Sequence, residues 1–263
     1  MYYKNVVVLR TNEYSSYWNE ILSDLSPDIF PLIVKDSRVK NISFTDLSSV
    51  DFNFENISAL ELKVCNDMQW RFGDYVLYLA DWYLEKNSIS YDFIWVVEPD
   101  IFLNTSLDKI IHNMNYDQSD FCSTYFSTAK DDWIWSKYIS EINMNKPYKT
   151  FFPFLRVSKN LVRNLYEARR KAPSLANDEV FVASYVGNKN ISFTLFSNSL
   201  QYNLNAFSYG LPHYVPMIKL FNNSKYEIYH PAFFSFSLFI KNIIKKRAYK
   251  KILKRILLLD NED

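Results

Sequence analysis

Apolar residues in the first hundred positions form three short, nearly continuous runs. They are NVVVL at 5–9, IFPLIV at 29–34 and YDFIWVV at 91–97. Continuous rather than alternating apolarity predicts β-strands that are covered on both faces. The first run ends at Arg10, the second at Lys35 and Asp36, and the third at Glu98. Each predicted strand therefore delivers charged side chains at its carboxyl end.

Helical periodicity separates these runs. A helix is predicted through Trp18, and residues 37–57 are expected to be loop and short irregular pieces. Ser58 and Glu61 have the spacing of a capping box that opens a helix. Asp74 is placed to cap a second helix, DYVLYLADWYLEK.

The second half continues the alternation of strands and helices. Strands are expected near 120–125 and at 191–196, and a strand or loop at 149–158. Ser158 and Asn177 each precede a segment with helical character. This order predicts an α/β fold with a mixed, mostly parallel sheet flanked by helices, in which ligands bind beyond the carboxyl ends of the strands.

Composition excludes several kinds of site. Only three glycines occur in 263 residues, so glycine-rich phosphate loops are excluded. Cys65 and Cys122 stand far apart, which offers neither a zinc pattern nor a disulfide framework and favours a reducing cytoplasm. The apolar stretch near the N-terminus is too short for a signal peptide, and no apolar run approaches the roughly 18 residues needed to span a bilayer.

Charge distinguishes the C-terminal segment from the rest of the chain. The 25 residues after position 238 hold eight Lys or Arg and three acids, which leaves 22 basic and 26 acidic residues before it. We expect one domain at 1–232 and a basic, aromatic, helical tail at 233–263. The tail suits contact with an anionic membrane surface, with a packed terminal helix or nucleic-acid binding as alternatives. Among these three interpretations, nucleic-acid binding is the one that we do not expect.

Glu98 and Asp100 are the strongest chemical signal. Two carboxylates spaced i and i+2 at the end of a buried strand point to one side and can share a hard cation such as Mg²⁺ or Mn²⁺. Pro99 between them ends the strand, because proline cannot donate to a sheet ladder. The alternative is a solvated acidic turn.

The segment FIWVVEPDIFLN resembles the acidic motif of GT-A glycosyltransferases, with Glu in the first position of the DxD pattern. The resemblance implies a GT-A, Rossmann-like fold and a nucleotide-sugar donor, a UDP-sugar in the first instance. It assigns metal ligation to Asp100 and a supporting role in metal or ribose binding to Glu98. His230, late in the chain, corresponds to an additional metal ligand and favours Mn²⁺ over Mg²⁺. A surface or capped core histidine is the alternative.

The same resemblance implies residues that contact the donor. Arg10, Thr11 and Asp36 stand at strand ends where such enzymes hold the base and ribose, although solvated strand ends would look alike. Arg71 is suited to pair with phosphate through its planar fork. Asp74 is placed to contact the donor or to cap its helix.

Asp178 and Glu179 resemble the acidic motif that meets the acceptor, where a carboxylate takes the proton of the attacking hydroxyl. Acids in the first turn of a helix also occur for capping and dipole reasons alone. Aromatic loops, including Trp133 and Trp135, offer faces for an acceptor sugar, although most aromatics are expected in the core.

These features predict a cytoplasmic glycosyltransferase, peripheral on the inner face of the membrane. It would transfer a sugar to a saccharide or lipid-linked saccharide acceptor in cell-surface polysaccharide biosynthesis. A sugar nucleotidyltransferase is the first alternative, although it normally presents a glycine-rich loop. A non-catalytic scaffold on a transferase-like fold is the second.

Overall fold

The computed structural model describes residues 1–36, 44, 46–200, 202–220 and 227–245. They divide into two compact units, one made of residues 1–99 and 111–200, the other of residues 100–110 and the described part of 201–263. The expected boundary at residue 232 falls inside the second unit, and residues 246–263 of the predicted tail lie outside the described ranges. Within those ranges, no helix has the length and apolar character needed to cross a membrane.

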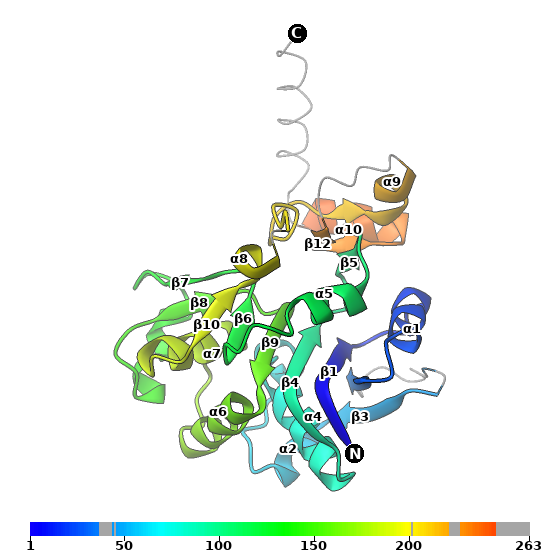
Figure 1. The fold of residues 1–263 in the computed structure, drawn as a ribbon. Coiled ribbons are helices and arrows are strands. Elements are labelled where there is room, and N and C mark those ends of the chain that lie inside the picture. The colour runs from blue at the N-terminus through cyan, green and yellow to red at the C-terminus, as the bar shows by residue number, and fades with distance from the viewer. Residues whose placement is uncertain (37–43, 45, 201, 221–226, 246–263) are drawn as a thin grey trace. The chain divides into compact units, whose positions relative to one another are not determined.

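A mixed sheet of seven strands forms the centre of the first unit, in the order β10-β6-β9-β4-β1-β2-β3 (Figure 1). Its strands are β1 (Tyr2–Thr11), β2 (Ile29–Asp36), β3 (Ser48–Phe52), β4 (Ser90–Val97), β6 (Phe121–Ser123), β9 (Phe154–Ser158) and β10 (Phe193–Leu195). Strands β4, β1, β2 and β3 run parallel, as do β10 and β6, while β9 is antiparallel to both of its neighbours. The predicted α/β class and the mixed, mostly parallel sheet are confirmed.

The three apolar runs form strands, as predicted, and the sheet places these strands next to one another in the order β4, β1, β2. Val6, Val7, Val8 and Leu9 of β1 are all fully buried, so side chains that point to opposite faces of the sheet are both covered. Parallel neighbours end at the same edge. Their carboxyl ends therefore bring the charged residues that follow them to one side of the sheet.

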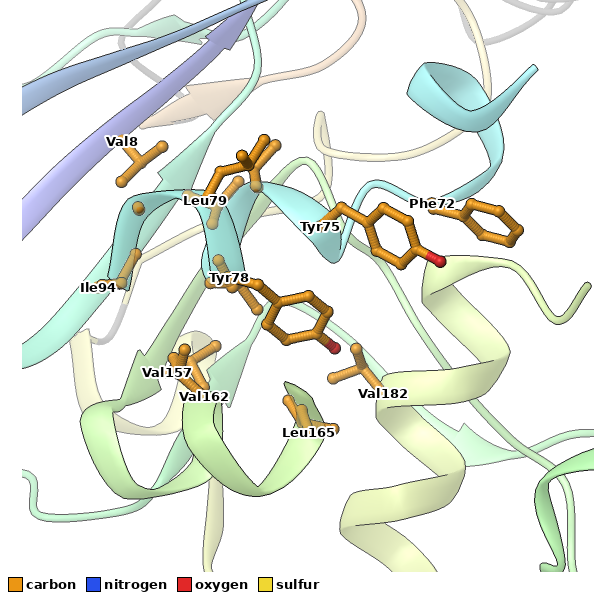
Figure 2. Close-up of a cluster of buried hydrophobic side chains, with 14 of the residues drawn as sticks. Val8, Phe72, Tyr75, Tyr78, Leu79, Ile94, Val157, Val162, Leu165 and Val182 are labelled. Atoms are coloured by element: carbon orange, nitrogen blue, oxygen red, sulfur yellow. The ribbon is translucent and has the colours of Figure 1, made fainter. Parts of the chain in front are cut away.

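One face of the sheet is covered by α4 (Tyr75–Lys86) and α6 (Lys159–Lys171), and α7 (Asp178–Asn188) adds to the same core. Figure 2 shows this packing. Its labelled side chains are Val8, Phe72, Tyr75, Tyr78, Leu79, Ile94, Val157, Val162, Leu165 and Val182. On the opposite face, Trp95 of β4 stacks on Phe196 of α8 (Phe196–Leu200), with ring centroids 5.6 Å apart. Helix α1 (Ser16–Ser23) buries Trp18, whose indole N–H donates to the Pro99 carbonyl at 3.0 Å.

Shorter elements complete the first unit. They are α2 (Phe54–Ala59), α3 (Met68–Arg71), β7 (Phe126–Thr128), β8 (Tyr148–Thr150) and the 3-10 helices η1 (Ser136–Tyr138) and η2 (Ser140–Ile142). Strands β7 and β8 form an antiparallel pair. Helix α5 (Leu107–Asn113) contains the division between the units.

Two local predictions before residue 62 are wrong. The Ser58 capping box does not open a helix, because Asn53 caps α2 one turn earlier, its side chain accepting from the Asn56 amide at 2.8 Å. Glu61 has a positive φ of 55°, which ends the helical path at the place where the box would begin one. Residues 48–52, expected to be loop, form β3, where alternate residues Val50 and Phe52 are buried.

The described part of the second unit contains two short strand pairs and the helices that follow them. Strand β5 (Phe102–Leu103) is antiparallel to β12 (Ile228–Tyr229), and β11 (His213–Tyr214) is parallel to β13 (Ala232–Phe233). Helix α9 (Val215–Leu220) follows β11, and α10 (Phe236–Lys245) follows β13. The peptide bond between His230 and Pro231 is cis.

Candidate functional site

Arg10 and Glu98 lie side by side where the central strands end. The parallel register pairs Leu9 of β1 with Val97 of β4, so the next residue of each strand carries one member of the pair. Arg10 Nη1 is 2.8 Å from Glu98 Oε1, and Arg10 Nη2 donates to the backbone carbonyl of Gln69. Both side chains are largely buried, so a charge-assisted hydrogen bond fixes their orientation.

Helix α7 brings a second carboxylate to the same arginine. Asn177 caps the helix by accepting from the Val180 amide at 3.2 Å, which places Asp178 in the first turn, as predicted. Asp178 Oδ2 is 3.9 Å from Arg10 Nη1, and its other oxygen accepts from the Glu179 amide at 2.8 Å. Arg10 therefore connects carboxylates from a strand end and a helix start that are 80 residues apart in the sequence.

Gly73 allows this close approach. A Cβ atom at Gly73 would overlap the Asp178 carboxylate and would lie 2.5 Å from Arg10 Nη1. The φ angle of Gly73 is not positive, so the glycine is required by lack of space rather than by backbone conformation. Any larger residue would displace either the arginine or the carboxylate.

Burial changes the acidity of the carboxylates on α7. Desolvation raises the pKa of Asp178 to about 7, and the charges of Asp74 and Glu98 add to that rise, while Arg10 opposes it. The pKa of Glu179 is also raised, first by desolvation and then by the neighbouring Asp178 and Glu98. Acids that exchange protons near neutral pH inside a cluster of charges are candidates for general acid or base chemistry.

The second unit places Asp100 beside His230. Asp100 Oδ2 lies 3.4 Å from His230 Nε2, and the Asp100 carbonyl accepts from the Ala232 amide at 2.7 Å. The other ring nitrogen, Nδ1, lies 3.0 Å from the Ser208 carbonyl oxygen. A carbonyl oxygen can only accept, so Nδ1 donates to Ser208 and Nε2 is the ring nitrogen that faces the carboxylate. An imidazole nitrogen and a carboxylate oxygen directed at each other are ligand types that can share a cation.

Comparisons with known proteins leave the family open. The chain matches no protein-family model and no curated protein. Among solved structures, it is similar to one described as "Crystal Structure of A197 from STIV". That similarity has a TM-score of 0.37 and 10% sequence identity, over 73% of this chain and 81% of that chain. A similarity at this level supports no argument about function.

Thr11 and Asp36, predicted to contact the base and ribose, are buried at the ends of β1 and β2. The Thr11 hydroxyl donates to the Glu13 carbonyl at 2.6 Å and accepts from the Glu13 amide, so it stabilises the turn that follows β1. Asp36 pairs in register with Phe52 of β3. Contact of these two residues with a nucleotide stays a prediction.

Arg71 pairs with an acid of its own helix turn, and the phosphate contact predicted for it stays a prediction. Its Nη2 and Nε donate to Asp67 Oδ2 at 2.7 and 3.0 Å, and its Nη1 donates to the Leu175 carbonyl at 3.3 Å. The pKa of Asp67 is lowered, mainly by the hydrogen bond from Arg71. The carboxylate of Asp67, four residues earlier in the sequence, thus balances the charge of Arg71.

Asp74 does not cap α4, and its carboxylate is fully buried in an ion pair. Arg169 Nε and Nη2 donate to its two oxygens at 2.8 and 2.9 Å, and the Tyr78 hydroxyl donates at 2.8 Å. The Arg169 guanidinium carbon also lies 3.7 Å from the ring centroid of Phe181. Direct contact of Asp74 with a donor is therefore corrected to a structural role, because neither oxygen reaches the surface.

Two residues of this region were missed in the sequence. Arg169 stands in the basic last turn of α6, Arg169-Arg170-Lys171, which has the appearance of a solvated helix end. Gln69 acts through its backbone carbonyl, and a carbonyl gives no signal in side-chain pattern. Amphipathic spacing does identify Arg169, because it lies on the face of α6 that contains the buried Val162 and Leu165.

Proposed function

We propose that the protein is a metal-dependent glycosyltransferase with a GT-A arrangement, transferring a sugar from a nucleotide donor to a saccharide or lipid-linked acceptor. The observation that supports this most is the cluster of Arg10, Glu98 and Asp178. It lies at the carboxyl edge of parallel strands, where α/β folds bind ligands. A glycosyl transfer needs a base for the acceptor hydroxyl and positive charge for the departing diphosphate.

Asp100 and His230 would hold the divalent cation. Their ligand atoms lie 3.4 Å apart, and the hydrogen bond to Ser208 orients the imidazole for metal binding. The cation would neutralise charge on the departing diphosphate. Glu98 precedes Asp100 by two residues in the sequence and remains the proposed third ligand. The histidine favours Mn²⁺ over Mg²⁺.

Asp178 is the proposed general base. Its pKa of about 7 leaves about half of the molecules ionised at neutral pH, which is the range in which a carboxylate accepts a proton efficiently. Arg10 holds the ionised form by lying 3.9 Å away, and Gly73 leaves room for both. Glu179, whose pKa is also raised, would remain protonated more often and assist by hydrogen bonding.

The proposed setting is cell-surface polysaccharide assembly at the inner face of a membrane. Helix α10 exposes Phe236, Leu238 and Ile244, and it precedes a segment rich in Lys and Arg. Exposed apolar side chains beside basic residues suit an anionic lipid surface.

A panel of nucleotide sugars tests the function. Hydrolysis and transfer would be measured with Mn²⁺ for wild type, Asp100→Ala and His230→Ala, with Mn²⁺ affinity determined separately by calorimetry. We expect turnover to fall about 100-fold or more in Asp100→Ala, because a bound metal contributes several kcal/mol of charge stabilisation. Mn²⁺ affinity should weaken in both variants.

His112→Ala is the matched control. His112 faces Asp28 at 3.6 Å, a similar His–Asp pair on the first unit that the proposal assigns no role. It should leave Mn²⁺ affinity and turnover unchanged. Wild type that binds no Mn²⁺ and turns over no nucleotide sugar would identify a non-catalytic protein and end the proposal.

A further inference from the structure

Two tryptophans pair with each other, and one of them, Trp70, directly follows Gln69, whose carbonyl binds Arg10. Trp70, in α3, is 65% exposed although it is a large apolar residue, and Trp135 is half-buried. Their ring centroids are 6.1 Å apart, with the ring planes inclined at 51°. Tyr138 continues the cluster, with its centroid 5.9 Å from that of Trp135. We refer to Trp70, Trp135 and Tyr138 as the aromatic shelf.

Arg71 packs against Trp135, one ring of the shelf. Its guanidinium carbon lies 5.4 Å from the Trp135 ring centroid, a cation–π contact. The same group is fixed by Asp67 and by the Leu175 carbonyl, so it cannot turn away from the ring without breaking these bonds. An aromatic ring whose orientation is already fixed loses less conformational entropy when a ligand binds.

The backbone connects the shelf to the Arg10 cluster at two points. Trp70 follows Gln69, whose carbonyl accepts from Arg10, and it precedes Gly73, which packs against Asp178, by three residues. Leu175, which accepts from Arg71, also precedes Asp178 by three residues. The stretch that carries Trp70 and Arg71 therefore also contacts Arg10 and Asp178, which couples one side of the shelf to the proposed base.

The chemistry of the shelf suits a sugar ring. Asp67 balances the charge of Arg71 beside Trp135, and the exposed Lys137, whose Nζ lies 5.0 Å from the Tyr138 ring centroid, adds a hydrogen-bond donor at the edge of the shelf. What it presents is aromatic faces bordered by an arginine and a carboxylate. A pyranose has the complementary form, with apolar C–H faces and hydroxyl groups at the edge.

We infer that the aromatic shelf binds a pyranose ring of the acceptor, with Trp70 and Trp135 as the residues that select a saccharide. This inference rests on the proposed transferase function and identifies its acceptor site. In this arrangement, stacking binds the ring and the edge hydroxyls bond to Arg71 and Asp67. Asp178 takes the proton of the reacting hydroxyl.

Ligand-observed NMR with a panel of methyl glycosides tests the binding step without donor or metal. The panel would contain methyl α- and β-glucoside, methyl β-galactoside and methyl β-N-acetylglucosaminide. We expect at least one to bind wild type and to bind Trp70→Ala and Trp135→Ala about tenfold more weakly. Trp70→Tyr keeps a ring and should keep most of the affinity. Tyr116→Ala, which removes an aromatic residue that is 94% exposed elsewhere, should bind as wild type does.

Kinetics separates this inference from the function on which it rests. In the tryptophan variants, the KM for the saccharide acceptor should rise about tenfold, while metal-dependent hydrolysis of the donor stays at the wild-type rate. Wild-type transfer with unchanged acceptor KM in Trp70→Ala would overturn the shelf and leave the transferase intact. Absence of donor turnover in wild type would overturn both. Binding of UMP, rather than of any glycoside, that is lost in Trp70→Ala would make the shelf a nucleobase site and overturn the inference.

Discussion

Replacing Asp178 by Asn should make the protein more stable and inactive. Burial raises the pKa of Asp178 from its ordinary value of 3.8 to about 7. At a pH where the carboxyl is ionised, that difference corresponds to an unfavourable contribution on the order of 4 kcal/mol to the stability of the folded state. Asparagine has nearly the same shape and cannot ionise, so the variant avoids this cost.

The predicted gain depends on pH in a specific direction. Between about pH 4 and pH 7 the folded protein holds a proton on Asp178 that the unfolded chain has released, so wild-type stability falls as the pH rises. The difference between Asp178→Asn and wild type should therefore be small near pH 4. It should grow to several kcal/mol above pH 7. Urea unfolding followed by circular dichroism at four pH values between 4 and 8 measures it.

The turnover of Asp178→Asn should fall although its stability rises. Loss of a general base lowers turnover by about 100-fold or more, while Mn²⁺ affinity stays unchanged because the Asp100 and His230 pair is intact. Glu55→Gln is the control for stability, since Glu55 is an exposed acid in the first turn of α2. It should shift stability by less than about 1 kcal/mol at every pH. A stability difference for Asp178→Asn that does not vary with pH would refute the assignment of a buried carboxyl with a raised pKa.

Three further perturbations follow from the contacts described above. Asp74→Ala should destabilise the protein by about 3–5 kcal/mol in urea unfolding, because it leaves Arg169 buried without its carboxylate partner. The double variant Asp74→Leu, Arg169→Met should recover most of that loss, and failure to recover would count against a simple ion pair. Gly73→Ala should lower turnover at least tenfold in the nucleotide-sugar assay by displacing Arg10 or the facing carboxylate, and wild-type activity would show that the cluster tolerates movement. Phe236→Ser in α10 should reduce co-sedimentation with vesicles that contain phosphatidylserine, whereas equal sedimentation would remove this side chain from the proposed membrane contact.

The sequence alone determined the central elements and their ends. Nearly continuous apolar runs predicted β1, β2 and β4, because a parallel strand covered on both faces cannot alternate. Ser158 and Asn177 predicted the starts of α6 and α7, since a side-chain cap acts over only three residues. Local signals of this kind were also sufficient to place Glu98 at a strand end and Asp178 in a first helical turn.

Only the tertiary structure decided which of those residues meet. The antiparallel insertion of β9 between β4 and β6 and the contact of Arg10 with Asp178 join segments far apart in the chain, and no short-range pattern encodes such pairings. The structure also moved Asp74 from a candidate ligand to a buried partner of Arg169, 95 residues away. Capping and strand apolarity depend on neighbours in the sequence, whereas burial, charge balance and pKa depend on neighbours in space. For that reason the candidate acids were visible in the sequence, and their chemical roles required the fold.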